Sequence, residues 1–389
     1  MAGNIVKLND GRYRLRYKDY SKYIKAKSPR DAEKQLAAFL TEMDSGDFSK
    51  PSKITFREFA NKYLEEYAKV ELAPKTIFRY KEMLESRIVP ALGNKRLEKI
   101  TPLDLLAFYS SLRGTHKYMG LSKGGEPIEK PAKALSEATI KHHHRLICSI
   151  FEKAIKWGIL KGNNPAKHVD APKNEKKKAN CFTEEQIRLM LEALNELNND
   201  EIKYKTATII ALVTGARLGE IMGLEWQDIN IENNSIEIRQ SSQYLPGQGI
   251  FTKNPKNETS KRKISVNDSL ISLLNDYKKD QREKGFICTA SSRLFINWEG
   301  KPMHPYTVTK WFPKFLEKNG MPRLNFHGLR HTSATFLISQ GMDIQTVASR
   351  LGHSTSATTQ NIYSHFMESK DRKAAELMEG ITIPKSCIM

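Results

Sequence analysis

The sequence predicts a chain of several domains: a small α+β unit, an all-α region, and a mixed, mainly helical domain with a small antiparallel sheet. Three patterns support this fold class. Polar and apolar residues alternate near the N-terminus, as in strands, and apolar residues recur at three- and four-residue spacing between 55 and 163, as in helices. Both patterns occur after residue 181. A chain of 389 residues is long enough for two or three hydrophobic cores.

The first unit, expected at residues 1–48, begins with strands. Residues 20–26 read as a second strand, and Ser28-Pro29 as the start of a helix that runs through Leu40. A sheet with several arginines on one face, backed by a helix, suits insertion into a DNA groove. The same arginines would also protect a solvated edge strand from aggregation. The predicted first strand separates three arginines from three apolar residues: Arg12, Arg14 and Arg16 against Tyr13, Leu15 and Tyr17.

Residues 54–165 are predicted to form a helical domain. Apolar spacing continues through several helices, with an inserted loop at 114–133 that is rich in Gly, Lys and Pro, and a long helix from about 136 to 157. That helix carries three adjacent histidines, 142–144, which point in different directions and do not converge on one metal ion. We therefore expect a polar surface that faces DNA, with His143 as one contact. A basic linker is expected at 166–180, where Lys177 would contact phosphates.

The last domain is expected at residues 181–389. Thr183 to Gln186 is a capping box that begins a helix, and an apolar helix follows at 205–213. Alternating residues within 229–238 and 249–266 predict short antiparallel strands. Further helices are expected near Ser269, Val308, Leu329, Ile344 and Thr358.

The composition points to a polyanionic partner. The chain has 63 Lys and Arg against 44 Asp and Glu, a net charge of +19 and a pI near 9.5, and such an excess favours nucleic acid because bound phosphates release counterions. A basic housekeeping protein or one that binds anionic membranes has the same composition. The four cysteines lie far apart without a Cys-x-x-Cys pair, which indicates a reduced cytosolic protein without a zinc site or disulfide framework. We expect neither a signal peptide nor a membrane span.

Four short motifs in the last domain carry the residues that suggest chemistry. They are TGARLGE around Arg217, HGLRHT with His327 and Arg330, LGH with His353, and TTQNIYSH with Tyr363. Two glycines around Arg217 suggest a guanidinium held beside exposed backbone N–H groups, a place to bind a phosphate. The alternative is that Arg217 is paired structurally with Glu220. Each motif is weak alone, but phosphoryl transfer explains why they occur together.

In order, local sequence and spacing, these motifs resemble those of the tyrosine recombinases, or phage-type integrases. The resemblance also includes the stretch from Trp157-Gly158 through Asn164-Pro165 before the linker, so it covers roughly residues 55 to 380. It implies a helical core-binding domain and a catalytic domain. The N-terminal unit resembles the arm-type DNA-binding domain of integrases from phages and conjugative elements of Gram-positive bacteria.

The resemblance implies a role for each residue of the set. Tyr363 would attack a DNA phosphodiester to give a 3′-phosphotyrosyl link, while Arg217, Arg330 and His353 bind the non-bridging oxygens. His327 would help to remove the tyrosine proton. The family also uses a hairpin lysine in the usual form Pro-Lys-Thr with Ser and Arg following. Lys256 matches it, although Asn257 replaces the threonine and other lysines crowd the same hairpin. No metal, ATP or other cofactor is implied.

The implied partners are double-stranded DNA at core and arm sites, three further copies of the chain in a DNA-bound tetramer, and an excisionase or a host DNA-bending protein. The segment after Tyr363, with a helix expected at 367–378, would pack on a neighbouring protomer, although it could also fold back on its own domain. The implied location is the bacterial cytoplasm, in association with the nucleoid. Two alternatives share this fold or chemistry: a catalytically silent DNA-binding regulator and a type IB topoisomerase. A metal-dependent transposase would need a clustered acidic triad, which the sequence does not suggest.

Overall fold

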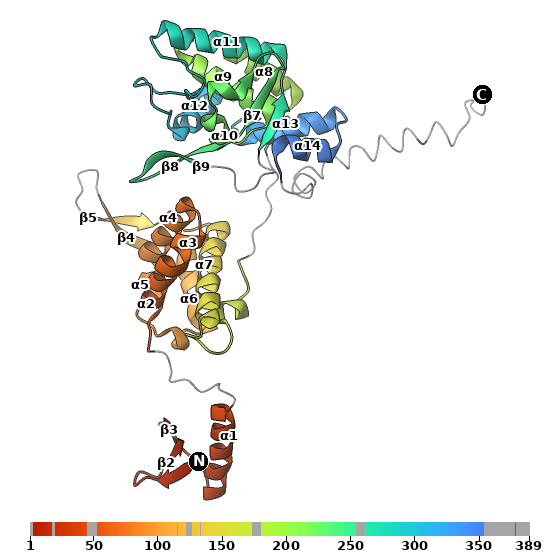
Figure 1. Cartoon of the computed structure of the whole chain (residues 1–389). Helices are drawn as coiled ribbons and strands as arrows, with labels where there is room; N and C mark the ends of the chain where they lie inside the picture. The colour runs from red at the N-terminus through yellow and green to blue at the C-terminus, as the bar shows by residue number, and fades with distance from the viewer. Residues whose placement is uncertain are drawn as a thin grey trace, which may run out of the picture. The chain divides into compact units, whose positions relative to one another are not determined.

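The computed structural model describes residues 3–17, 20–44, 53–114, 116–121, 127–132, 134–172, 180–253, 261–353 and 378. The chain divides into two compact units, Met1–Glu175 and Lys176–Met389. The described residues are mainly helical with small antiparallel sheets, as predicted (Figure 1). Lys177, Lys256, Tyr363 and the helix expected near Thr358 lie outside these residues.

The N-terminal part of the first unit is a three-stranded sheet with one helix. Strands β1 (Asn4–Lys7), β2 (Tyr13–Tyr17) and β3 (Tyr20–Ile24) are antiparallel in the order β1-β2-β3, and α1 (Pro29–Asp44) follows. Because side chains alternate along β2, one face carries arginines and the other packs into a core. That core contains Tyr13, Leu15, Ala32 and Phe39. The predicted strands and helix are confirmed.

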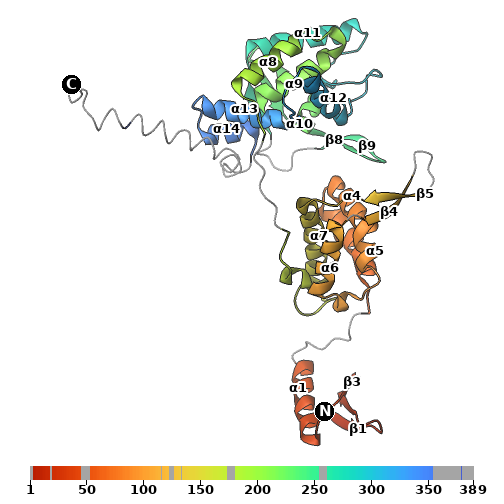
Figure 2. The same ribbon diagram turned by 180° about the vertical axis from the view of Figure 1, so that it is seen from behind.

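The second part of this unit is helical. Helix α2 (Phe56–Lys62) continues through a π-helical segment, Tyr63–Ala68, into α3 (Lys69–Glu71), and α4 (Pro74–Met83) continues through another, Leu84–Ile88, into α5 (Val89–Leu92). Helices α6 (Pro102–Arg113) and α7 (Glu137–Lys156) lie beside each other (Figure 2). Capping boxes at Thr55 and Thr101 begin α2 and α6 by satisfying backbone N–H groups that no helical carbonyl reaches.

Two sequence predictions for this unit need correction. The segment expected as a loop contains an antiparallel pair, β4 (His116–Leu121) and β5 (Pro127–Ala132); the chain between them contains Gly124-Gly125, a dipeptide typical of hairpin turns. The expected linker begins too early, because Ala166 and Val169 are buried in the helical core. A single turn, Pro165–His168, packs there against α7.

The second unit is built around one buried helix. Helix α9 (Ile202–Thr214) packs against α10 (Leu218–Gly223), α11 (Asp268–Glu283), α12 (Pro305–Lys318) and α13 (Gly328–Ser339). The predicted capping box at Thr183 begins α8 (Glu184–Asn195), and α14 (Ile344–Leu351) follows α13. Apolar residues occupy nearly every face of α9, which explains why neighbouring helices surround it. Within the described part of the chain, no helix is long and apolar enough to cross a membrane.

The strands of the second unit form two small antiparallel sheets. One has the order β10-β7-β6, with β6 (Ile229–Asn230), β7 (Ser235–Ile238) and β10 (Arg262–Ser265). The other is a hairpin of β8 (Ser241–Leu245) and β9 (Gly249–Lys253), and β8 packs against α10. The strands predicted in the two alternating segments are therefore confirmed, and β10 is followed in the chain by α11.

Candidate active site

Three segments distant in the sequence meet where α9 ends, α13 begins and α14 ends. Nη1 of Arg330 donates to the carbonyl oxygens of Gly215 and Leu351, each at 2.8 Å. Nη2 of Arg217 donates to the carbonyl oxygen of Gly352 at 3.3 Å. These bonds bring the first three predicted motifs into one cluster.

Arg330 lies in the first turn of α13 and is only 3% exposed. The helix begins where the side chain of Asn325 accepts the N–H of Gly328 at 2.8 Å. A buried guanidinium requires hydrogen-bond acceptors, and the two carbonyl oxygens provide them. Arg330 thus connects the turn after α9 to the end of α14.

Arg217 stands at the N-cap of α10 and is more accessible. Its N–H donates to Oε2 of Glu220 at 2.9 Å, and its Nη1 donates to Oε1 of the same carboxylate at 2.9 Å. The structural ion pair considered as an alternative therefore exists. The side chain of Arg217 nevertheless remains 43% exposed, so the pairing orients this guanidinium without burying it.

The histidines of the motifs surround the arginines. Burial first, and then the charges of Arg330 and Arg217, lower the pKa of His327, and the same causes in the same order lower that of His353 to about 4. The ring of His331 lies perpendicular to that of His327 with centroids 5.1 Å apart. Burial, followed by His327 and Arg330, lowers the pKa of His331 to about 4. At neutral pH these rings are therefore uncharged.

The position of His353 is set by how α14 ends. Gly352 has φ +69°, in the left-handed region, and caps the helix. The N–H of His353 then donates to the carbonyl oxygen of Ala348 at 3.0 Å. The LGH motif is therefore a helix end that holds the imidazole beside the two arginines.

One residue of this cluster was missed by the sequence reasoning. Arg262, the first residue of β10, donates from Nη2 to Oε2 of Glu220 and from Nε to the carbonyl oxygen of Arg350, both at 2.8 Å. In the sequence it lies between Lys261 and Lys263, and its charge does not distinguish it from these basic neighbours. Alternation along β10 was the available signal, because it separates Arg262 and Ile264 from Lys263.

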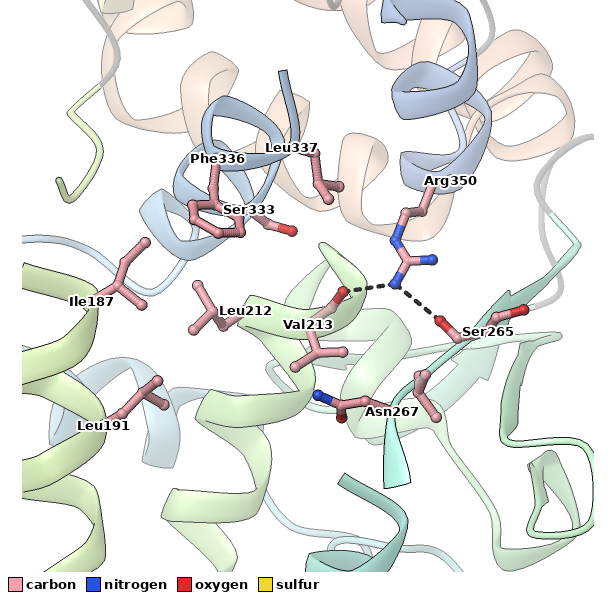
Figure 3. A pocket seen from close by; sticks show the side chains of 11 residues that line it. Ile187, Leu191, Leu212, Val213, Ser265, Asn267, Ser333, Phe336, Leu337 and Arg350 are labelled. Carbon is pink, nitrogen blue, oxygen red and sulfur yellow. Dashed lines mark hydrogen bonds between the residues drawn. The ribbon is translucent and has the colours of Figure 1, made fainter. Parts of the chain in front are cut away.

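An apolar cavity of about 550 Å³ opens beside this cluster (Figure 3). The guanidinium of Arg350 stands at its edge, where Nη2 donates to the carbonyl oxygens of Val213 at 2.9 Å and Ser265 at 3.0 Å. Helices α8, α9 and α13 supply its apolar lining: Ile187, Leu191, Leu212, Val213, Phe336 and Leu337.

The three arginines predicted to contact DNA in the N-terminal sheet have different surroundings. Arg14 and Arg16 lie on the sheet face opposite the core, where Arg14 pairs across strands with Tyr23. Arg12 is held by Asp10, whose Oδ2 accepts its Nε–H at 2.7 Å.

His143 does not lie on a DNA-facing surface: it is 3% exposed, within the core of the helical part. The prediction for His143 is wrong because its spacing from Ile140 and Ile147 puts it on the apolar face of α7. His142 and Arg145 are the exposed residues of that stretch.

Comparison with known proteins gives consistent matches. The model of the phage integrase family matches residues 180–370, and that of the phage integrase N-terminal SAM-like domain matches residues 55–113. The ICEBs1 integrase of Bacillus subtilis is 27% identical over 64% of this chain and 67% of its own length. A tyrosine recombinase XerC-like protein of Caldanaerobacter subterraneus is 24% identical over 92% of this chain and 91% of its own.

Solved structures share the fold. The Tn1549 transposon integrase in complex with transposon right end DNA superposes with a TM-score of 0.68 at 22% identity, over 84% of this chain and 100% of that one. A lambda integrase tetramer bound to a Holliday junction gives 0.56 at 18% identity, over 92% of this chain and 94% of that one. Both likenesses concern the arrangement of the elements.

Proposed function

Since this chain belongs to the phage integrase family of tyrosine recombinases, enzymes that break and rejoin DNA strands, we propose that it integrates and excises a mobile genetic element. The observation that carries the proposal is the convergence of Arg217, Arg330 and His353 from three separate segments. Two guanidinium groups with a neighbouring imidazole suit the non-bridging oxygens of a phosphodiester, where negative charge grows during the reaction.

Tyr363 is the proposed nucleophile. Its oxygen attacks the phosphorus, the P–O5′ bond breaks, and the products are a 3′-phosphotyrosyl link and a free 5′-hydroxyl. A phenol has a pKa near 10, so the reaction needs a base at the tyrosine and an acid at the leaving oxygen. His327, uncharged at neutral pH, helps to accept the first proton, and Lys256 supplies the second to the 5′-oxygen.

The proposed reaction needs no ATP or metal ion. One phosphodiester is exchanged for another, so the bond energy remains in the covalent intermediate and drives rejoining when a 5′-hydroxyl attacks. Arg217, Arg330 and Lys256 supply the positive charge that a metal ion supplies in other phosphoryl-transfer enzymes.

The N-terminal sheet is the proposed contact to a second kind of DNA site, the arm site. Arg14 and Arg16 share one face of β2 with Tyr23 of β3, opposite the core. A three-stranded ribbon is narrow enough to enter a major groove with that face toward the bases. Lys177 in the basic connection would add a phosphate contact.

We propose that four copies act together on DNA. The apolar cavity beside Arg350 (Figure 3) would accept apolar side chains from the segment that follows Tyr363 in a neighbouring copy. That segment includes Phe366, Leu377 and Met378, and Met378 is 56% exposed. Its docking would make cleavage by one protomer depend on the next.

We further propose that an excisionase or a host DNA-bending protein determines whether the element is integrated or excised. The reaction would take place on the nucleoid in the bacterial cytoplasm.

A nicked suicide substrate that carries the junction sequence of the element tests the mechanism. The 5′-hydroxyl is lost with the short fragment, so wild-type protein should accumulate as a covalent adduct, and Tyr363→Phe should bind the DNA without forming one. Tyr306→Phe, which changes an exposed tyrosine of α12, serves as the matched control and should react normally.

Two results would contradict the proposal. Absence of an adduct with wild type on its own junction would favour the catalytically silent regulator. Relaxation of supercoiled DNA that lacks any junction, at the rate seen with the junction, would favour the topoisomerase.

A further inference from the structure

Arg262 contacts both α10 and the end of α14 within the active-site cluster, although it is nearly inaccessible. Its side chain is 8% exposed. Nη2 donates to Glu220 near the start of α10, and Nε donates to the carbonyl oxygen of Arg350 at the end of α14. Because its Nε and Nη2 are already bonded to a backbone carbonyl oxygen and to Glu220, we expect Arg262 to affect the reaction through these neighbours.

The contacts form a closed ring. Arg262 binds Glu220, Glu220 binds the guanidinium of Arg217, and Arg217 donates to Gly352. The ring closes because the guanidinium of Arg262 lies against Gly352: a Cβ at that position would stand 2.8 Å from its Nη1 and 3.0 Å from its Cζ. Strand β10 therefore braces the LGH turn and the N-cap of α10 at the same time.

Charge gives this ring a second property. With Arg217 alone, Glu220 would form a one-to-one ion pair and cancel the charge offered to DNA. Burial by itself would raise the pKa of Glu220, but the hydrogen bond and charge of Arg262, followed by those of Arg217, lower it below its usual value. The carboxylate therefore stays ionised and is shared by two arginines, which leaves the ring with one net positive charge.

We propose that Arg262 is a positioning residue of DNA cleavage: by sharing Glu220 it leaves the charge of Arg217 available to the scissile phosphate and keeps Arg217 and the LGH turn in register. The proposal rests on the proposed function, because the step it affects is attack by Tyr363.

Single-turnover cleavage of the nicked junction, at saturating protein, separates this role from binding and folding. Arg262→Gln should lower the thermal midpoint, because it removes one partner of a buried ion pair. Measured well below that midpoint, adduct formation should be slower by about tenfold or more, with the Kd for the same DNA close to that of wild type. Arg262→Lys, which keeps the charge but not both hydrogen bonds, should regain part of the rate. The control is Arg239→Gln, which removes an arginine paired with Glu225 and Asp228 in the same unit and should leave the rate unchanged.

A double-mutant cycle tests the link through Glu220. If the two residues act as one unit, Arg262→Gln combined with Glu220→Gln should lose less rate than the product of the two single losses. Losses that multiply, a wild-type rate for Arg262→Gln, or equal losses in binding and cleavage would each overturn the role of Arg262. Absence of an adduct with wild-type protein would instead overturn the proposed function.

Discussion

At the scale of single residues, the two arginines of the cluster differ in what surrounds them. Arg330 is buried and connects Gly215 to Leu351, so its removal would loosen the site as well as reduce its charge. Arg217 is 43% exposed and rests on a carboxylate. We therefore expect replacement of Arg217 to weaken mainly the interaction with the charged phosphate. Replacement of Arg330 should lower both the stability of the fold and the rate of cleavage.

The histidines lead to a prediction about pH. His331 and His353 have pKa values of about 4 in the folded protein against a usual 6.5, so the unfolded chain binds more protons between these values. The free energy of unfolding of the second unit should therefore fall as the pH drops from 6.5 to about 4 and change little from this source below that. Denaturant titrations followed by tryptophan fluorescence measure the fall.

The variant His331→Gln removes one of the two groups and should lessen this dependence on pH. His168→Gln, which changes an exposed histidine of the first unit, is the control and should leave it as in wild type. A fall of the same size in His331→Gln and in wild type would contradict the assignment.

At the scale of elements, the site depends on helix ends. Helix α9 stops at Gly215, with φ +63°, and α14 stops at Gly352. Left-handed caps turn the chain sharply, so the residues after them leave the helix axis and can face one another. The carbonyl oxygens exposed at these ends are the ones that Arg330 and Arg217 bind.

The variant Gly215→Ala tests this dependence. A Cβ there would lie 2.3 Å from Cδ2 of Leu351 and would have to adopt a left-handed conformation. We expect a loss of at least about 2 kcal/mol in unfolding free energy and slower cleavage, because both carbonyl partners of Arg330 shift. Gly285→Ala, at φ +84° with open space around it, should lose only about 1 kcal/mol and cleave normally. Equal effects of the two variants on cleavage would refute the argument.

At the scale of the whole molecule, the proposed roles in DNA binding and in cleavage divide between the two units. The first unit, Met1–Glu175, contains the arginine-bearing sheet and the helical part, and the second contains the cluster around Arg330. The net charge of +19 is spread over both units, so each of them favours binding to a polyanion such as DNA. Changes in the N-terminal sheet should therefore alter which DNA is held without altering cleavage at the core site.

Arg14→Ala combined with Arg16→Ala tests this separation. Affinity for arm-site DNA should fall, and the slope of log K against log salt should become less steep by about 1 to 2, while adduct formation on the nicked core junction keeps the wild-type rate. Lys34→Ala, an exposed change on α1, is the matched control. A parallel loss of core-site cleavage in the double variant would contradict the separation.

Much of the fold was predictable because its signals are local. The alternation in β2, the capping boxes at Thr55, Thr101 and Thr183, and the apolar spacing of α7 each depend on a few neighbouring residues. Predictions failed where they relied on the type of a residue rather than on its position in the local pattern. The insertion after α6 contains glycine and proline yet pairs as β4 and β5, and His143 is polar yet occupies the apolar face of its helix.

The sequence by itself determined the motifs, their order and the chemistry that they share, because residue type and spacing suffice to relate Arg217, Arg330 and His353. Only the tertiary structure decided how they act together. The partner of Glu220 lies 42 residues away in Arg262, and the acceptors of Arg330 lie 115 and 21 residues away. No local pattern records such contacts, because they arise from packing α9, α13, α14 and β10 around one core.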